Sequence, residues 1–293
     1  MNYVVFEAGS RAGYSTEMFF LDYINQTGNR NDVLYMVDDS KEVNKVSSKY
    51  RVKRISYDEF LNLDKSDLVI FPGDELSRQS KEYVAELAKE KSYSFVEECY
   101  YNKKDINEWL ESVTGGCKIK VPKTFSFGDV CIRPNTMSAG TKGVQFLKNV
   151  SVTELIDIEE EYVVDVLRNK NSIKLYPRAV VLKNGYDRMI KPLAEDSEIS
   201  KAVIEFVIKA CPINEGLFSD VFHLQLAKDK NGVLYYIESS KRISGTSIIN
   251  IFRGMNPFCF INGVQSKDRF NPFINGMWYR YEDFINEFEL WGC

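Results

Sequence analysis

The sequence of 293 residues predicts an α/β and α+β protein, in which a doubly wound parallel-sheet domain precedes a strand-rich region. Two observations predict this class. Near the N-terminus, continuous apolar runs typical of buried parallel strands alternate with stretches of helical periodicity. Farther along, short strands separated by turn signals dominate, with an amphipathic helix among them. The chain is long enough for more than one domain.

Four strands and two helices are predicted in the first ninety residues. The strands are continuously apolar, which predicts a parallel sheet covered by helices on both faces. The strands are Tyr3 to Ala8, Val33 to Val37, Lys53 to Ser56 and Asp67 to Phe71, and the helices are Thr16 to Ile24 and Ser80 to Lys89. In a doubly wound sheet, ligand sites lie at the carboxyl ends of the strands.

The remaining chain is predicted to hold more strands than helices. A hairpin is indicated by the turn signal Lys230 to Gly232 between two apolar runs. The predicted strands are Asp129 to Arg133, Glu161 to Arg168, Leu175 to Leu182, Phe222 to Ala227 and Val233 to Glu238, and the helices are Lys103 to Val113, Glu198 to Ala210 and a closing helix within Phe270 to Trp291.

Composition and charge exclude several classes of function. The formal net charge of -4 disfavours a wide surface for nucleic acid or an anionic membrane, and no apolar run is long enough for a membrane span. The six cysteines form no C-x-x-C pair, so we expect reduced thiols in a cytoplasmic protein. A Ser-His-Asp hydrolase would need the single histidine, His223, which lies in an apolar alternation typical of a strand.

A loop of small residues follows one predicted strand. Cys131 to Val144 contains a cation, Arg133, and then several serine, alanine and glycine residues. Small side chains let backbone N–H groups approach phosphate oxygens, so this segment is a candidate phosphate-binding loop. It is not a Walker A loop, because the G-x-x-x-x-G-K-[ST] pattern is absent. A plain hairpin loop explains this segment, taken alone, equally well.

The predicted hairpin carries a second candidate site. Gln225 and Glu238 lie on its neighbouring strands, and oxygen ligands of this kind suit Mg²⁺. Arg242 follows as a fork-shaped donor for phosphate or carboxylate. Gly245 to Ser247 then opens an apolar stretch, which predicts a helix N-terminus able to bind an anion. The alternative is a hairpin with a solvated glutamate and arginine.

Charged residues after other strands are weaker candidates. Arg11 could meet an acid, and Asp74 or Glu75 an amine, at turns that follow strands of the first domain. Arg188 and Lys191 could also bind an acid. Ordinary solvated loops explain these positions as well.

Together, these segments resemble the ATP-grasp superfamily, most closely the branch of carbamoyl-phosphate synthase large subunits and small amino-acid ligases. Cys131 to Val144 resembles its Lys/Arg-Pro strand with a glycine-rich lid loop, and Glu161 to Leu167 resembles its E-Y-x-V-D-V-L strand. Gln225 and Ile237 to Ser244 resemble its Q-F…I-E-x-N-x-R-x-S signature. The matches run in family order over roughly Ser92 to Met255.

The resemblance implies three parts: a pre-ATP-grasp domain over 1–92, a lid subdomain over 93–157 and a C-terminal subdomain over 158–293. It also implies that ATP and Mg²⁺, with Mn²⁺ as a possible substitute, are the cofactors. The residues it implies for the nucleotide are Lys103, Lys104, Arg133, Ser138, Ala139, Gly140, Gly143, Ile156, Asp157, Ile158 and Glu161. Those it implies for the metal are Gln225, Glu238 and Ser240. It implies catalytic roles for Glu238 and Arg242, and places Ser247 as a further group near the transferred phosphoryl group.

The activity implied is ligation of a small acid, such as an amino acid, to an amine through an acyl phosphate. Such chemistry depends on positioning and charge neutralisation, which a chain with one histidine can supply. Ser240 replaces the asparagine usual in the family, which leaves open a nucleotide-binding protein with weakened catalysis. Phosphorylation of a small acid such as bicarbonate is another alternative. A homodimer is expected only by analogy.

Overall fold

A computed structural model gives the fold of the chain. It describes residues 1–6, 8–9, 11–29, 31–37, 52–64, 68–72, 103–132, 145–148, 150–169, 171–184, 186–210, 221–240, 242–267 and 279–280. Side chains are not described at 72, 103–106, 126, 132, 182–188 and 279–280 within these ranges. All structural statements below concern these residues.

The N-terminal strands form a four-stranded parallel sheet in the order β3-β2-β1-β4, which confirms the predicted parallel arrangement. Apolar side chains buried on both faces explain why these strands read as continuous apolar runs. Bounds are β1 Asn2–Phe6, β2 Val33–Val37, β3 Val52–Ile55 and β4 Leu68–Pro72, with helices α1 Arg11–Thr27 and α2 Tyr57–Leu61. The predicted helix Ser80 to Lys89 lies outside the described residues.

Helix α2 was not predicted, although its first turn carries a sequence signal. Ser56 is its N-cap, and a capping box joins this residue to Glu59: the Ser56 hydroxyl accepts from the Glu59 amide, while the Glu59 carboxylate accepts from the Ser56 amide. Phe60 then turns into the core below the sheet, where it packs edge-on against Phe6. A helix of five residues is too short for apolar periodicity to reveal it.

The second sheet has seven strands in the order β15-β12-β11-β10-β13-β14-β5. All neighbouring strands are antiparallel except β14 and β5, which pair in parallel. The bounds are β5 Ile119–Lys120, β10 Ile158–Arg168, β11 Ile173–Asn184, β12 Tyr186–Pro192, β13 Val221–Asp229, β14 Leu234–Ser240 and β15 Tyr279–Arg280. The predicted β13–β14 hairpin is confirmed.

One face of this sheet is covered by two helices, α5 Glu198–Ala210 and α4 Lys103–Val113. Their bounds match the predicted helices. Side chains of α5 such as Phe206 pack into an apolar core with Val164 and Leu224 of the sheet. Burying this core is the main contribution to the stability of this half of the protein.

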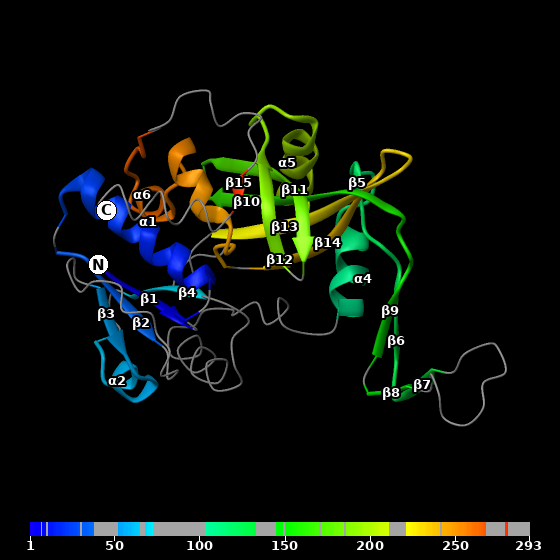
Figure 1. The fold of residues 1–293 in the computed structure, drawn as a ribbon, viewed down its shortest axis with the longest axis horizontal. Helices are drawn as coiled ribbons and strands as arrows, with labels where there is room; N and C mark the ends of the chain where they lie inside the picture. Colours follow the sequence, from blue (N-terminus) through cyan, green and yellow to red (C-terminus); the bar gives the residue numbers. More distant parts are fainter. Residues whose placement is uncertain are drawn as a thin grey trace.

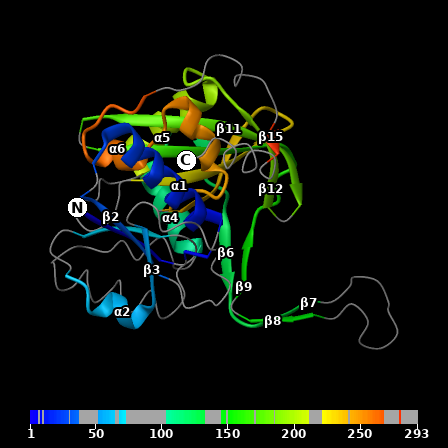
Figure 2. The same cartoon turned by 60° about the vertical axis from the view of Figure 1, so that its left-hand side comes forward.

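A long arm carries four short strands away from the rest of the chain, as both Figure 1 and Figure 2 show. Strand β6 pairs with β9 and β7 pairs with β8, both antiparallel. The bounds are β6 Thr124–Phe127, β7 Val130–Ile132, β8 Gln145–Leu147 and β9 Val150–Thr153. Aromatic side chains are exposed on the arm, including Phe125 at 57% and Phe146 at 79%.

The two sheets share one apolar core through α1 and two short helices, η3 Ser247–Arg253 and α6 Pro257–Ile261. Phe258 packs edge-on against Tyr3, with 4.9 Å between their ring centroids. The contact between α1 and η3 is close: Ser15 Oγ donates to the Gly245 carbonyl at 3.1 Å. A Cβ at Gly245 would lie 2.9 Å from Arg11 Cβ, so only glycine fits without a shift.

Three predictions in this half of the chain need correction. Ser247 begins a 3₁₀-helix as part of the core, where we expected a helix N-terminus able to bind an anion. Arg188 and Lys191 lie within β12, because the chain continues as a strand after β11. Tyr279 and Arg280 pair with β12 as β15, whereas we expected a closing helix; the rest of that segment lies outside the described residues. No helix in the described ranges is long and apolar enough to cross a bilayer.

Candidate functional site

The site is built on the β13–β14 hairpin. Gln225 lies directly opposite Glu238, and its Nε2 donates to Glu238 Oε1 at 2.6 Å. A shift in register follows between Gln225 and Leu226. The Glu238 side chain is exposed, whereas most residues of the neighbouring strand β13 are buried. The structure therefore brings this amide and carboxylate together on one face of the sheet.

The donor atoms fit a hard cation only in part. Glu238 supplies one carboxylate, and the Gln225 amide would present its oxygen after a half-turn, since the two orientations fill the same space. Among the described residues, no group of three or more His, Cys, Asp or Glu could hold a metal ion. A set with one carboxylate suits Mg²⁺ that keeps water and phosphate oxygens in its shell.

Ser240 and Arg242 lie at the end of β14. Ser240 pairs with His223, which places its hydroxyl on the same face as Glu238 two residues away. Across this face, His223 Nδ1 lies 3.1 Å from the Arg242 carbonyl. A carbonyl only accepts, so Nδ1 carries the proton. Burial and the nearby Arg242 lower the pKa of His223 to about 4, so the imidazole is neutral near pH 7.

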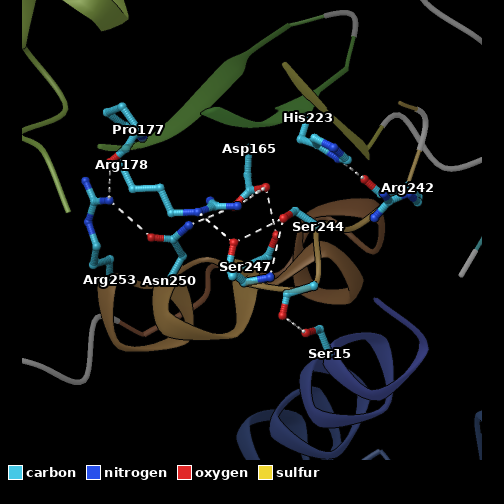
Figure 3. Close-up of polar contacts among 12 residues, drawn as sticks. Ser15, Asp165, Pro177, Arg178, His223, Arg242, Ser244, Ser247, Asn250 and Arg253 are labelled. Atoms are coloured by element: carbon cyan, nitrogen blue, oxygen red, sulfur yellow. Dashed lines mark hydrogen bonds and ion pairs between the residues drawn. The ribbon is translucent and has the colours of Figure 1, made fainter. Parts of the chain in front are cut away.

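Farther along the same face, where Asp165 pairs with His223, a buried charged network joins the sheet to η3 (Figure 3). Asp165 of β10 and Arg178 of β11 form an ion pair and are 1% and 0% exposed. Asp165 also accepts from Ser247 Oγ at 2.7 Å and from Asn250 Nδ2 at 2.8 Å, while Arg178 Nε donates to Thr246 Oγ1 at 3.1 Å.

This network corrects the role expected for Ser247. The hydroxyl donates to a buried carboxylate and the residue is 0% exposed, so it is not placed to contact a phosphoryl group. Instead, Ser247 helps hold the segment that follows Arg242 against the sheet. The three acceptor interactions at Asp165 compensate the cost of burying its charge.

The residues expected at the adenine and ribose lie where β9 leads into β10. Asp157 is exposed and forms an ion pair with Lys230 at 2.8 Å. Ile158 is 44% exposed and pairs with Asp229, and Ile156 is half-buried. Glu161 lies two residues before Val163, which is opposite Gln225, so Glu161 lies on the same face of the sheet as the hairpin pair.

Other predicted residues cannot be placed. Lys103 and Lys104 begin α4, but only their backbone is described. The predicted phosphate loop follows β7, and its residues Arg133, Ser138, Ala139, Gly140 and Gly143 lie outside the described residues, as do Asp74 and Glu75. Arg11 begins α1 and contacts the segment at Gly245.

Sequence reasoning missed the pairing of Asp165 with Arg178. Both are charged residues inside predicted apolar strands, which was the available signal, because an isolated charge is rarely buried without a partner. Their pairing depends on the register between β10 and β11, in which Asp165 lies opposite Tyr176. That register is set by the rest of the sheet.

No protein-family model and no curated protein sequence matches the chain. Solved structures do match. An L-amino acid ligase from Bacillus licheniformis superposes with a TM-score of 0.58 at 13% identity, covering 94% of this chain and 77% of that one. An ATP-grasp superfamily protein from Archaeoglobus fulgidus gives 0.60 at 15%, covering 95% and 91%.

A third match is a carboxyaminoimidazole ribonucleotide synthase from Aspergillus clavatus complexed with ATP. It gives a TM-score of 0.60 at 12% identity, covering 94% of this chain and 79% of that chain. At identities this low, the superpositions establish only the fold. The activity has to be argued from the site. The chain has the ATP-grasp fold, as the resemblance of its motifs implied.

Proposed function

Starting from the ATP-grasp fold, we propose that this protein is an ATP-dependent ligase that joins an amino acid or another small acid to an amine. The observation that carries the proposal is the contact of Gln225 with Glu238, which sets an exposed carboxylate and an amide side by side on a hairpin whose strand β13 is mostly buried. The L-amino acid ligase among the structural neighbours supports this class of reaction.

The proposed reaction has two steps. A carboxylate oxygen of the acid attacks the γ-phosphorus of ATP, so that the bond to the β-γ bridging oxygen breaks and ADP leaves. The amine then attacks the acyl carbon of the acyl phosphate, and inorganic phosphate leaves as the amine gives up a proton to solvent. Both steps depend on orientation and on neutralising phosphate charge more than on a protein nucleophile.

The hairpin residues have distinct proposed roles. Glu238 and Gln225, with the Ser240 hydroxyl, would hold Mg²⁺, and the bound ion would neutralise phosphate charge. Arg242 would orient the transferred phosphoryl group or the substrate carboxylate. Its backbone is fixed by the neutral His223 on one side, and the Asp165 network holds the residues that follow it. The neutral His223 anchors the Arg242 backbone without adding a charge, and the Asp165 carboxylate of the second anchor is already paired with Arg178.

The remaining assignments are part of the same proposal. Arg133, Lys103 and Lys104 would contact the phosphates, and the loop containing Ser138, Ala139, Gly140 and Gly143 would cover them. Ile156 to Ile158 and Glu161 would contact the adenosine. The division into a pre-ATP-grasp domain over 1–92, a lid subdomain over 93–157 and a C-terminal subdomain over 158–293 is likewise proposed.

The test is a screen of amino-acid pairs with ATP and Mg²⁺, in which phosphate release is measured and products are identified by mass spectrometry. One pair should give phosphate, ADP and a product equal in mass to the two substrates minus water. Glu238→Gln should lower the rate by about 10²-fold or more, because a carboxylate that holds the metal is lost. Glu198→Gln, at an exposed position on α5, is the matched control.

Near-normal turnover in Glu238→Gln would defeat the metal assignment. Ser240 favours a second candidate, a nucleotide-binding protein with weakened catalysis, because a hydroxyl is a poorer ligand for a divalent cation than a carboxylate or an amide oxygen. ATP binding without phosphate release for any substrate pair would support that candidate. ATP turnover that requires bicarbonate but no amine would instead indicate phosphorylation of a small acid.

A further inference from the structure

A pocket of about 340 Å³ lies at the edge of the large sheet, away from the β13–β14 hairpin. Strand β12 pairs with β11 only as far as Arg178, and none of the described strands pairs with Ile173 to Leu175 on that side. The pocket lies against this stretch, and β10 and β13 separate it from Glu238. Its volume is within the range of pockets that bind small molecules.

The polar part of the pocket contains charges of both signs. Arg253, at the end of η3, and Lys174 of β11 are cationic, and Glu195 is anionic. The Arg253 guanidinium donates to neutral acceptors: the carbonyls of Pro177 and Leu193 and the Asn250 side chain. Among the described residues, no ion pair joins Arg253 to a carboxylate, although Glu195 lies near enough to act on its charge and the Tyr176 ring centroid is 5.9 Å from the guanidinium carbon.

The opposite part of the pocket is apolar. Ile173 and Leu175 project from β11, and Ile204 projects from α5 with 40% of its surface exposed. A ligand that covers an exposed isoleucine beside a concave surface binds more favourably, by roughly 25 cal/mol for each Å² of apolar area removed from water. The pocket therefore offers an aliphatic surface next to two cations and one carboxylate.

We propose that this pocket binds an α-amino acid with an aliphatic side chain, as a second small-molecule site distinct from the Gln225–Glu238 site. The carboxylate of the ligand would contact Arg253 and Lys174, its ammonium group would contact Glu195, and its side chain would lie against Ile204. A zwitterion matches both signs of charge, whereas a simple carboxylate would leave Glu195 uncompensated and a simple amine would leave the cations uncompensated.

The experiment is an isothermal calorimetric titration of the full chain with L-leucine in the absence of nucleotide. L-leucinamide, which lacks the carboxylate, and 4-methylpentanoate, which lacks the amine, are the comparison ligands. Each should bind about tenfold more weakly or worse, because a hydrogen-bonded charged contact is lost. Equal affinity for all three ligands, or no measurable leucine binding, would overturn the proposal.

Two substitutions on one helix locate the site. Ile204→Glu places a carboxylate at the apolar wall and should weaken leucine binding about tenfold or more. The control Ile208→Glu should leave leucine binding unchanged, because Ile208 is 59% exposed, lies one turn away and is not part of the pocket lining. Equal effects of the two variants would refute this location. Glu238→Gln should retain leucine binding here, so this result is independent of the proposed ligase activity; loss of binding would instead place leucine at the hairpin.

Discussion

Replacing His223 by asparagine removes the only imidazole in the chain and keeps an N–H donor near the Arg242 carbonyl. The folded protein holds this histidine neutral, because burial and Arg242 lower its pKa from 6.5 to about 4. The unfolded chain takes up the proton more readily than the folded one. Stability from this group is therefore present above pH 6.5 and is lost as the pH falls towards 4.

The size of the effect follows from the two pKa values. Between pH 7.5 and pH 5, the linkage relation gives a loss of about 2 kcal/mol in the free energy of unfolding, rising to about 3 kcal/mol below pH 4. Wild type should lose this much more stability than His223→Asn over the same interval. Carboxylates titrate in both proteins, so their contribution cancels in the comparison.

Urea denaturation at pH 7.5 and at pH 5, followed by circular dichroism, measures both free energies. The variant curve should be flatter, and the gap between the two proteins should narrow or reverse at the lower pH. Parallel pH dependence in wild type and variant would refute the buried neutral imidazole and, with it, the argument that Arg242 is anchored without an added charge.

Three further substitutions, two of them with a matched control, test buried contacts near the site and in α1. Asp165→Ala leaves Arg178 buried without its anion and should cost about 3–5 kcal/mol of unfolding free energy. The control Asp157→Ala removes an exposed ion pair and should cost less than about 1 kcal/mol. Equal costs for the two variants would contradict the buried network. Gly245→Ala should cost about 1–3 kcal/mol because its Cβ meets Arg11, while Gly128→Ala, with open space around it, should stay within about 0.5 kcal/mol in the same urea assay. Burial raises the pKa of Glu17 despite Arg54 at 3.6 Å, so the stability that this group contributes is present below pH 4.5 and is lost as the pH rises. Glu17→Gln should therefore gain stability relative to wild type between pH 4 and pH 8. A constant difference between the two proteins in thermal unfolding would count against this prediction.

The regular elements were predictable because local pattern and tertiary burial agree in them. Strand β2 and helices α4 and α5 have the predicted bounds, since each has continuous or periodic apolar residues that the fold buries. The short strands of the arm from β6 to β9 were mostly missed. Their side chains are largely exposed, so the alternation that reveals a half-buried strand is weak there.

The site was predictable to the extent that it depends on one hairpin. The turn signal at Lys230 to Gly232 sets the strands, and their pairing brings Gln225 and Glu238 together. Ser247 could not be assigned from sequence, because its partner Asp165 is 82 residues away in the chain. Contacts of this range follow from the packing of η3 on the sheet, which local pattern does not encode.

The most direct test of the central claim is a crystal structure with a non-hydrolysable ATP analogue and Mn²⁺, read by the anomalous scattering of manganese. If ligation takes place at the hairpin, the anomalous peak should lie within bonding distance of both the Glu238 carboxylate and the nucleotide phosphates. A nucleotide bound elsewhere on the chain, or manganese with no contact to Glu238, would contradict the assignment.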